Sequence, residues 1–80
     1  MPVHSNLKAL REAKGVTKTF LANGLGMSLQ GYSYLENGES NISVERIKDI
    51  ARLLGEPVNV FFDDKLTETV IKRYESRQVD

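Results

Sequence analysis

The sequence has no cysteine and no tryptophan, one histidine, two prolines and no excess of either charge among its 80 residues. Without cysteine the chain forms no disulfide and holds no thiolate zinc site. No apolar run approaches the roughly 20 residues that a membrane span requires. The N-terminal residues lack the basic and apolar regions of a secretory signal. We therefore expect a cytoplasmic protein that does not associate with membranes.

The residue types also argue against catalysis. His4 has no second histidine to form a metal-binding pair, and no glycine loop of the phosphate-binding type is present. Nothing in the sequence resembles a set of nucleophile, base and orienting residue. The sequence thus predicts that the protein is not an enzyme and uses neither a metal nor a cofactor.

The composition is that of one small globular domain, with 40% apolar and 28% charged residues. Eleven Lys and Arg balance eleven Asp and Glu. Residues 1–40 carry four basic and three acidic residues, and residues 41–80 carry seven and eight. Because neither half is basic, binding to nucleic acid would have to come from the placement of a few side chains.

Three hydroxyl residues mark the starts of helices. Thr17, Ser28 and Ser43 each follow an apolar residue and precede another by four positions. A Ser or Thr with these neighbours is typical of a helix N-cap with a hydrophobic staple. The pattern predicts helices starting near residues 18, 29 and 44, after a first helix over residues 6–14 that ends at Gly15.

The second half of the chain continues the helical pattern. A helix from Val44 is closed by Gly55, and Pro57 opens a further short helical segment. Asp63 and Asp64 indicate a cap before a last amphipathic helix, and residues 76–80 are expected to fray. No strand alternation stands out. We predict a compact all-α domain of five helices over residues 1–62, with an additional C-terminal amphipathic helix over residues 63–80.

A short helix, a tight turn at Gly26 and a second short helix make a helix-turn-helix. The surrounding motif is Leu7-x-x-Leu10-Arg11-x-x-Lys14-Gly15, Thr17-Lys18-x-x-Leu21-Ala22-x-x-Leu25-Gly26-Met27-Ser28, Tyr32-Ser33-x-Leu35-Glu36-Asn37-Gly38 and Ile50-Ala51-x-Leu53-Leu54-Gly55. Over residues 7–62 it resembles the phage repressor and Cro-type (xenobiotic-response-element) helix-turn-helix DNA-binding family. This resemblance implies a prokaryotic or phage transcriptional regulator, repressor-like, that binds specific sequences of double-stranded DNA.

The resemblance also implies which residues read bases, because in this family the helix starting near residue 29 enters the major groove. An amide such as Gln30 can bond bidentately to adenine. Leu29 would touch a thymine methyl group, and Tyr34 a base edge or a phosphate. The implied base-reading residues are Leu29, Gln30, Gly31, Ser33 and Tyr34.

Further positions are implied as contacts to the DNA backbone. Lys18 opens a helix, where the helix N-terminus and a cation both favour an anion. The implied phosphate contacts are Lys18, Ser28, Asn37 and Arg11, with Lys8 and Lys14 adding charge from the first helix.

The last helix has two interpretations. Its stripe of Leu66, Val70, Ile71 and Tyr74 either folds back on the chain's own core or pairs with a second copy. Helix-turn-helix proteins commonly read two half-sites as two-fold dimers. We therefore favour dimerisation through this stripe and a homodimer on a palindromic operator.

An alternative hypothesis is a protein-protein interaction module that kept the fold and lost operator recognition. The zero net charge, the acidic Glu39 and the apolar Leu29 and Tyr34 on the reading face motivate it.

Overall fold

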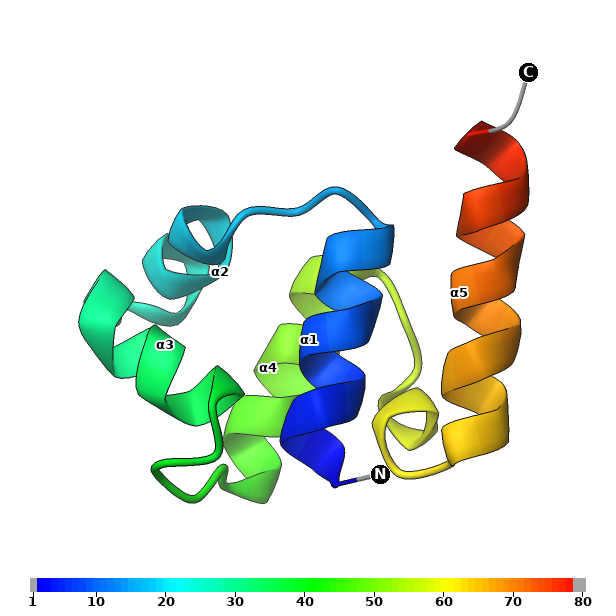
Figure 1. Ribbon diagram of the computed structural model, residues 1–80. Helices are drawn as coiled ribbons and strands as arrows, with labels where there is room; N and C mark the ends of the chain where they lie inside the picture. Colours follow the sequence, from blue (N-terminus) through cyan, green and yellow to red (C-terminus); the bar gives the residue numbers. More distant parts are fainter. Residues whose placement is uncertain (1, 79–80) are drawn as a thin grey trace.

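Six helical segments make up the described part of the chain, in the predicted order (Figure 1). The computed structural model describes the backbone of residues 2–78 and the side chains of residues 2–76. The segments are α1 (Val3–Ala13), α2 (Lys18–Leu25), α3 (Leu29–Glu36), α4 (Val44–Leu54), the 3-10 helix η1 (Val58–Phe61) and α5 (Asp64–Gln78). No strand occurs within these residues, and the all-α fold class is confirmed.

Helices α2, α3 and α4 begin where their cap residues predict. In each case the cap hydroxyl accepts a hydrogen bond from the backbone N–H three residues further on: Thr17 from Phe20 (3.0 Å), Ser28 from Gly31 (3.0 Å) and Ser43 from Arg46 (3.1 Å). The apolar residue four positions after each cap is buried, namely Leu21, Tyr32 and Ile47. Local contacts therefore fix how the chain enters these helices.

Helix α1 begins at Val3 and not at Asn6, where we had predicted its start. Pro2 is the N-cap, and its carbonyl accepts the backbone N–H of Asn6 at 3.2 Å. The Asn6 side chain is buried and donates from Nδ2 to the Phe61 carbonyl and to Asp64 Oδ1, both at 3.0 Å. The predicted start was three residues too late, because Pro2 already opens the helix and Asn6 lies within its first turns.

Helix α1 is central to the packing. It contacts α3 on one side and α5 on the other, so that the α2–α3 pair and α5 lie on opposite sides of the molecule (Figure 1). All helices contribute to one core: Leu7, Leu10, Leu21, Ala22, Tyr32, Leu35, Ile47, Ile50, Ala51, Leu54, Val60, Phe61 and Val70. The position of α3 is thus set by contacts with both α1 and α2.

Helix α5 turns its apolar stripe toward the core of its own chain. Val70 is 6% exposed, and Ile71 and Tyr74 are partly buried against the core, whereas Leu66 is exposed. Asp63 Oδ1 accepts the backbone N–H of Leu66 at 3.2 Å, which confirms the predicted cap. The stripe therefore folds back on its own core through Val70, Ile71 and Tyr74, as the other interpretation predicts, while a dimer contact through the stripe stays a prediction.

The end of α5 lies at Gln78. The fraying predicted for residues 76–80 therefore concerns the last residues of this helix and a tail that lies outside the described residues. Among the helices that the structure describes, none combines the length and the apolar character needed to cross a bilayer.

Lys14 joins the end of α1 to α4 and α5. Its Nζ donates to Glu56 Oε2 at 2.7 Å and to the carbonyl oxygen of Leu54. It also lies 4.8 Å from the centre of the Tyr74 ring, within the range of a cation–π interaction. The charge of Lys14 is therefore used within the fold, and Lys14 does not serve as the additional DNA-facing charge we had expected.

Candidate nucleic-acid interface

A tight turn sets α3 against α2. Gly26 ends α2 in the left-handed conformation, with φ of 68°, which glycine adopts without strain. The backbone N–H of Met27 bonds to the Ala22 carbonyl at 2.9 Å, and that of Gly26 to the Asn23 carbonyl at 3.2 Å. These two bonds form a Schellman motif. The motif redirects the chain within a few residues, so that α3 starts at Leu29, four residues after the end of α2.

The predicted base-reading residues lie together on α3. Leu29 is 50% and Tyr34 44% exposed, and Gln30 is also exposed. Gly31 and Ser33 are half-buried. The opposite face of the helix is buried through Tyr32, Leu35 and Glu36. The helix therefore presents one solvent-facing surface of mixed apolar and amide character, which we call the reading face: Leu29, Gln30, Gly31, Ser33 and Tyr34.

The cap of α3 accounts for Gly31. A Cβ atom at this position would lie 3.1 Å from Ser28 Oγ and 3.6 Å from Met27 Cε, so it would press on the cap. The glycine thus has a reason within the fold, apart from any approach to DNA. Ser28 Oγ accepts the Gly31 N–H, which leaves the hydroxyl hydrogen to donate to an acceptor such as a phosphate.

Arg11, one of the predicted phosphate contacts, is buried instead of facing solvent. Its Nε donates to Glu36 Oε2 and its Nη2 to Glu36 Oε1, both at 2.8 Å, and its Nη1 donates to the Val16 carbonyl at 2.8 Å. The side chains of Arg11 and Glu36 are 9% and 0% exposed. We correct the assignment of Arg11, because its guanidinium is engaged by this bidentate pair inside the fold.

The pair alters the ionisation of its neighbours. Burial opposes ionisation of Glu36, but the hydrogen bonds from Arg11 outweigh it, and the pKa of Glu36 is lowered below 4.5. Burial, together with the adjacent Glu36 carboxylate, raises the pKa of Tyr32 above its ordinary value. Both groups are thus held in the states they have at neutral pH, Glu36 ionised and Tyr32 neutral.

The sequence analysis missed this role of Glu36, although a signal for it was present. Glu36 lies four residues after Tyr32 and so falls on the inward face of α3. A carboxylate on a buried helix face requires a partner. The sequence around Glu36 does not identify that partner, because Arg11 lies 25 residues away in the chain.

Lys18 and Asn37, two of the predicted phosphate contacts, both lie at helix ends. Lys18 is the first residue of α2, whose N-terminus is capped by Thr17. After burial, the Arg11 contacts and Tyr32, the charge of Lys18 is the last influence on the pKa of Glu36, which it lowers. Asn37 follows α3 directly and is exposed. The structure thus places a cation at the first position of α2 and an exposed amide directly after α3.

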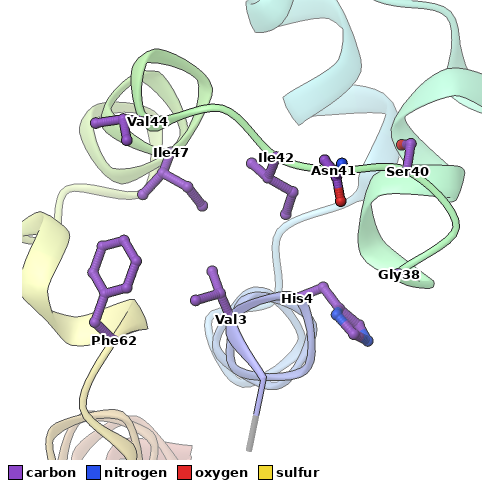
Figure 2. A pocket seen from close by; sticks show the side chains of 9 residues that line it. All are labelled: Val3, His4, Gly38, Ser40, Asn41, Ile42, Val44, Ile47 and Phe62. Atoms are coloured by element: carbon purple, nitrogen blue, oxygen red, sulfur yellow. The ribbon is translucent and has the colours of Figure 1, made fainter.

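The loop after α3 rests on the N-terminal helix. Gly38 has φ of 79°, and a Cβ atom there would lie 2.6 Å from the His4 ring. Figure 2 shows the His4 ring beneath this loop, beside a cavity of about 220 Å³. The cavity is lined on its apolar side by Val3, Ile42 and Ile47. Contact with α1 therefore fixes the loop that leads out of the reading helix.

Comparisons with known proteins agree with this architecture. A family model described as helix-turn-helix matches residues 7–61. An HTH-type transcriptional regulator of Sinorhizobium medicae is 29% identical over 62 residues, which are 78% of this chain and 45% of that protein. A transcriptional regulator in the ATPase CF(0) region of Rhodospirillum rubrum is 34% identical over 62 residues, covering 78% of this chain and 57% of the relative.

The chain spans about half the length of the curated relatives it matches. No solved structure matches it with significance. The family match covers α1 from Leu7 onward, all of α2, α3 and α4, and the 3-10 helix η1. The chain belongs to the Cro/C1-type helix-turn-helix family.

Proposed function

We propose that the protein binds specific sequences of double-stranded DNA and regulates transcription in the cytoplasm of a prokaryote or of a cell infected by phage. The observation that carries this proposal is the exposed reading face of α3, which follows the tight turn after α2. An exposed helix of this kind fits the major groove, and a helix N-terminus favours a phosphate. The names of its relatives as transcriptional regulators support the same function.

Within this proposal, base contacts come from the reading face and register comes from few phosphate contacts. Gln30 reads a base edge, with Leu29 and Tyr34 beside it. Lys18, Ser28 and Asn37 contact the DNA backbone. Because the chain has no net charge, we expect modest non-specific affinity, since that affinity depends on the number of neutralised phosphates.

The first experiment measures binding of a fluorescent duplex across a salt series. Loss of a phosphate contact through Lys18→Ala should flatten the dependence of log affinity on log salt by roughly one unit. Lys72→Ala is the matched control, because it removes the same charge from an exposed position on α5, on the other side of the molecule. Equal slopes for the two variants would contradict the role of Lys18.

We further propose that two copies bind a palindromic operator, since a single helix of eight residues provides few base contacts. The stripe on α5 offers only part of its surface to a second copy, because Val70 is buried and Ile71 and Tyr74 are partly buried against their own chain. Selection of bound duplexes from a random pool should return a consensus with two-fold symmetry. Sedimentation with and without that duplex should show two chains per operator.

The same measurements test the alternative of a protein-interaction module. The exposed Leu29 and Tyr34 favour it, because apolar side chains on a surface can bind a protein as well as a thymine methyl group. Absence of duplex binding at low salt would reject the proposed function and leave this alternative.

A further inference from the structure

Two exposed side chains of the reading face are bonded to each other. Gln30 Nε2 donates to the hydroxyl oxygen of Tyr34 at 2.8 Å. The residues are one helical turn apart and therefore project from the same side of α3. Tyr34 remains 44% exposed. The bond is thus made at the surface that the proposed function places against DNA.

The bond restricts what Gln30 offers to a base. A free glutamine amide has two N–H donors and one carbonyl acceptor, and its terminal torsion is broad. When one N–H is given to Tyr34, the amide nitrogen is held on the Tyr34 side. One donor and one acceptor then remain side by side for an external partner.

This pattern matches one purine better than the other. In the major groove adenine offers the acceptor N7 beside the N6 donor, whereas guanine offers two acceptors, N7 and O6. The donor and acceptor left on Gln30 can bond to both atoms of adenine. Against guanine, the Gln30 carbonyl would face O6, and two acceptors do not bond.

We propose that Gln30 and Tyr34 act as a joint reader of an A·T base pair, in which Tyr34 is a positioning residue that makes Gln30 discriminate adenine from guanine. This proposal rests on the proposed function, because it concerns the same face of α3. It differs from a direct contact between Tyr34 and a phosphate, which would affect affinity for all sequences alike.

The test starts from the consensus selected with the wild-type protein. Gln30→Ala identifies the base pair that Gln30 reads, as the position at which preference is lost. We expect adenine there, favoured over guanine on the order of ten- to hundredfold, as for a bidentate contact. At this position Tyr34→Phe should reduce the adenine-to-guanine ratio by about two- to tenfold, the effect of one hydrogen bond. Affinity for unrelated duplexes should stay unchanged.

Tyr32→Phe is the matched control, because it removes a hydroxyl from the same helix at a buried position. It should alter stability and leave the adenine-to-guanine ratio as it is. Each of three results would overturn the joint reader: guanine preferred at the Gln30 position, an unchanged ratio in Tyr34→Phe, or an equal loss of affinity for every sequence. Failure of the wild-type protein to bind any duplex specifically would instead overturn the proposed function, and the joint reader with it.

Discussion

Removing one member of the Arg11–Glu36 pair should strongly destabilise the protein. Two charge-assisted bonds of 2.8 Å join side chains that are 9% and 0% exposed. Breaking such a pair leaves an uncompensated buried charge, at a cost of about 3–5 kcal/mol. A domain of 80 residues has a free energy of unfolding of about 4–12 kcal/mol. We therefore expect Arg11→Met or Glu36→Leu alone to remove about a quarter or more of the total stability.

The double variant separates the cost of an unpaired charge from the value of the pair. Replacing both partners of a buried ion pair by apolar residues of similar size is often neutral or stabilising by about 1–4 kcal/mol. The combined Arg11→Met and Glu36→Leu variant should therefore unfold near or above the wild-type urea midpoint, measured by circular dichroism. Single variants within about 1 kcal/mol of wild type, or a double variant that loses the sum of the two single losses, would refute this reasoning.

Three further predictions concern the same framework. The pKa of Glu36 is lowered below 4.5 in the folded state. The ionised carboxylate should therefore stabilise the fold fully above about pH 4.5, and this contribution should be lost as pH falls through the folded-state pKa. Urea midpoints measured across pH should show this loss in the wild type and not in the double variant. Gly38→Ala should lower the free energy of unfolding by about 1–2 kcal/mol because of its positive φ, and further because the added Cβ atom clashes with the His4 ring. Thermal denaturation should show that adding His4→Ala recovers the part of the loss that is due to the clash. Lys14→Met should lower the free energy of unfolding by about 1–3 kcal/mol, because it removes the ammonium group that lies against the Tyr74 ring. It should also speed amide hydrogen exchange in α5, and unchanged exchange would contradict this role.

The helix starts could be predicted because their causes are local. The bonds of Thr17, Ser28 and Ser43 each span three residues. A short stretch of sequence therefore contains all the residues that form a cap and its staple. Gly26 and Gly55 end helices for a reason equally local, the left-handed conformation. These signals defined most of the fold and brought the residues of the reading face together.

Contacts between distant segments could not be predicted in the same way. Arg11 and Glu36 each lie on a helix with an ordinary mixture of charged and apolar residues. Neither position therefore predicts that the two side chains form an ion pair. Asn6 is a good cap residue by type, yet it bonds to the Phe61 carbonyl, 55 residues away. Local preference was overridden at both places by the need to pair buried polar groups.

The C-terminal stripe shows a different limit. Its periodicity correctly indicated one apolar face on α5, but periodicity does not say what covers that face. The structure supplies the cover from the same chain, with Val70 in the core and the Thr67 hydroxyl bonded to the Val60 carbonyl. What covers the stripe follows from tertiary packing, which the spacing of residues along α5 does not contain.

The placement of cations favours sequence preference over high non-specific affinity in the proposed DNA binding. Arg11 and Lys14 bond within the fold, and Arg46 donates to the Leu25 carbonyl at the end of α2 at 3.2 Å. Three cations around the helix-turn-helix therefore hold its helices in place. Since non-specific affinity rises with the number of phosphates neutralised, their use inside the fold lowers binding to arbitrary duplexes. Binding to one sequence then depends mainly on the base-edge contacts of α3, whose position the same cations help to fix.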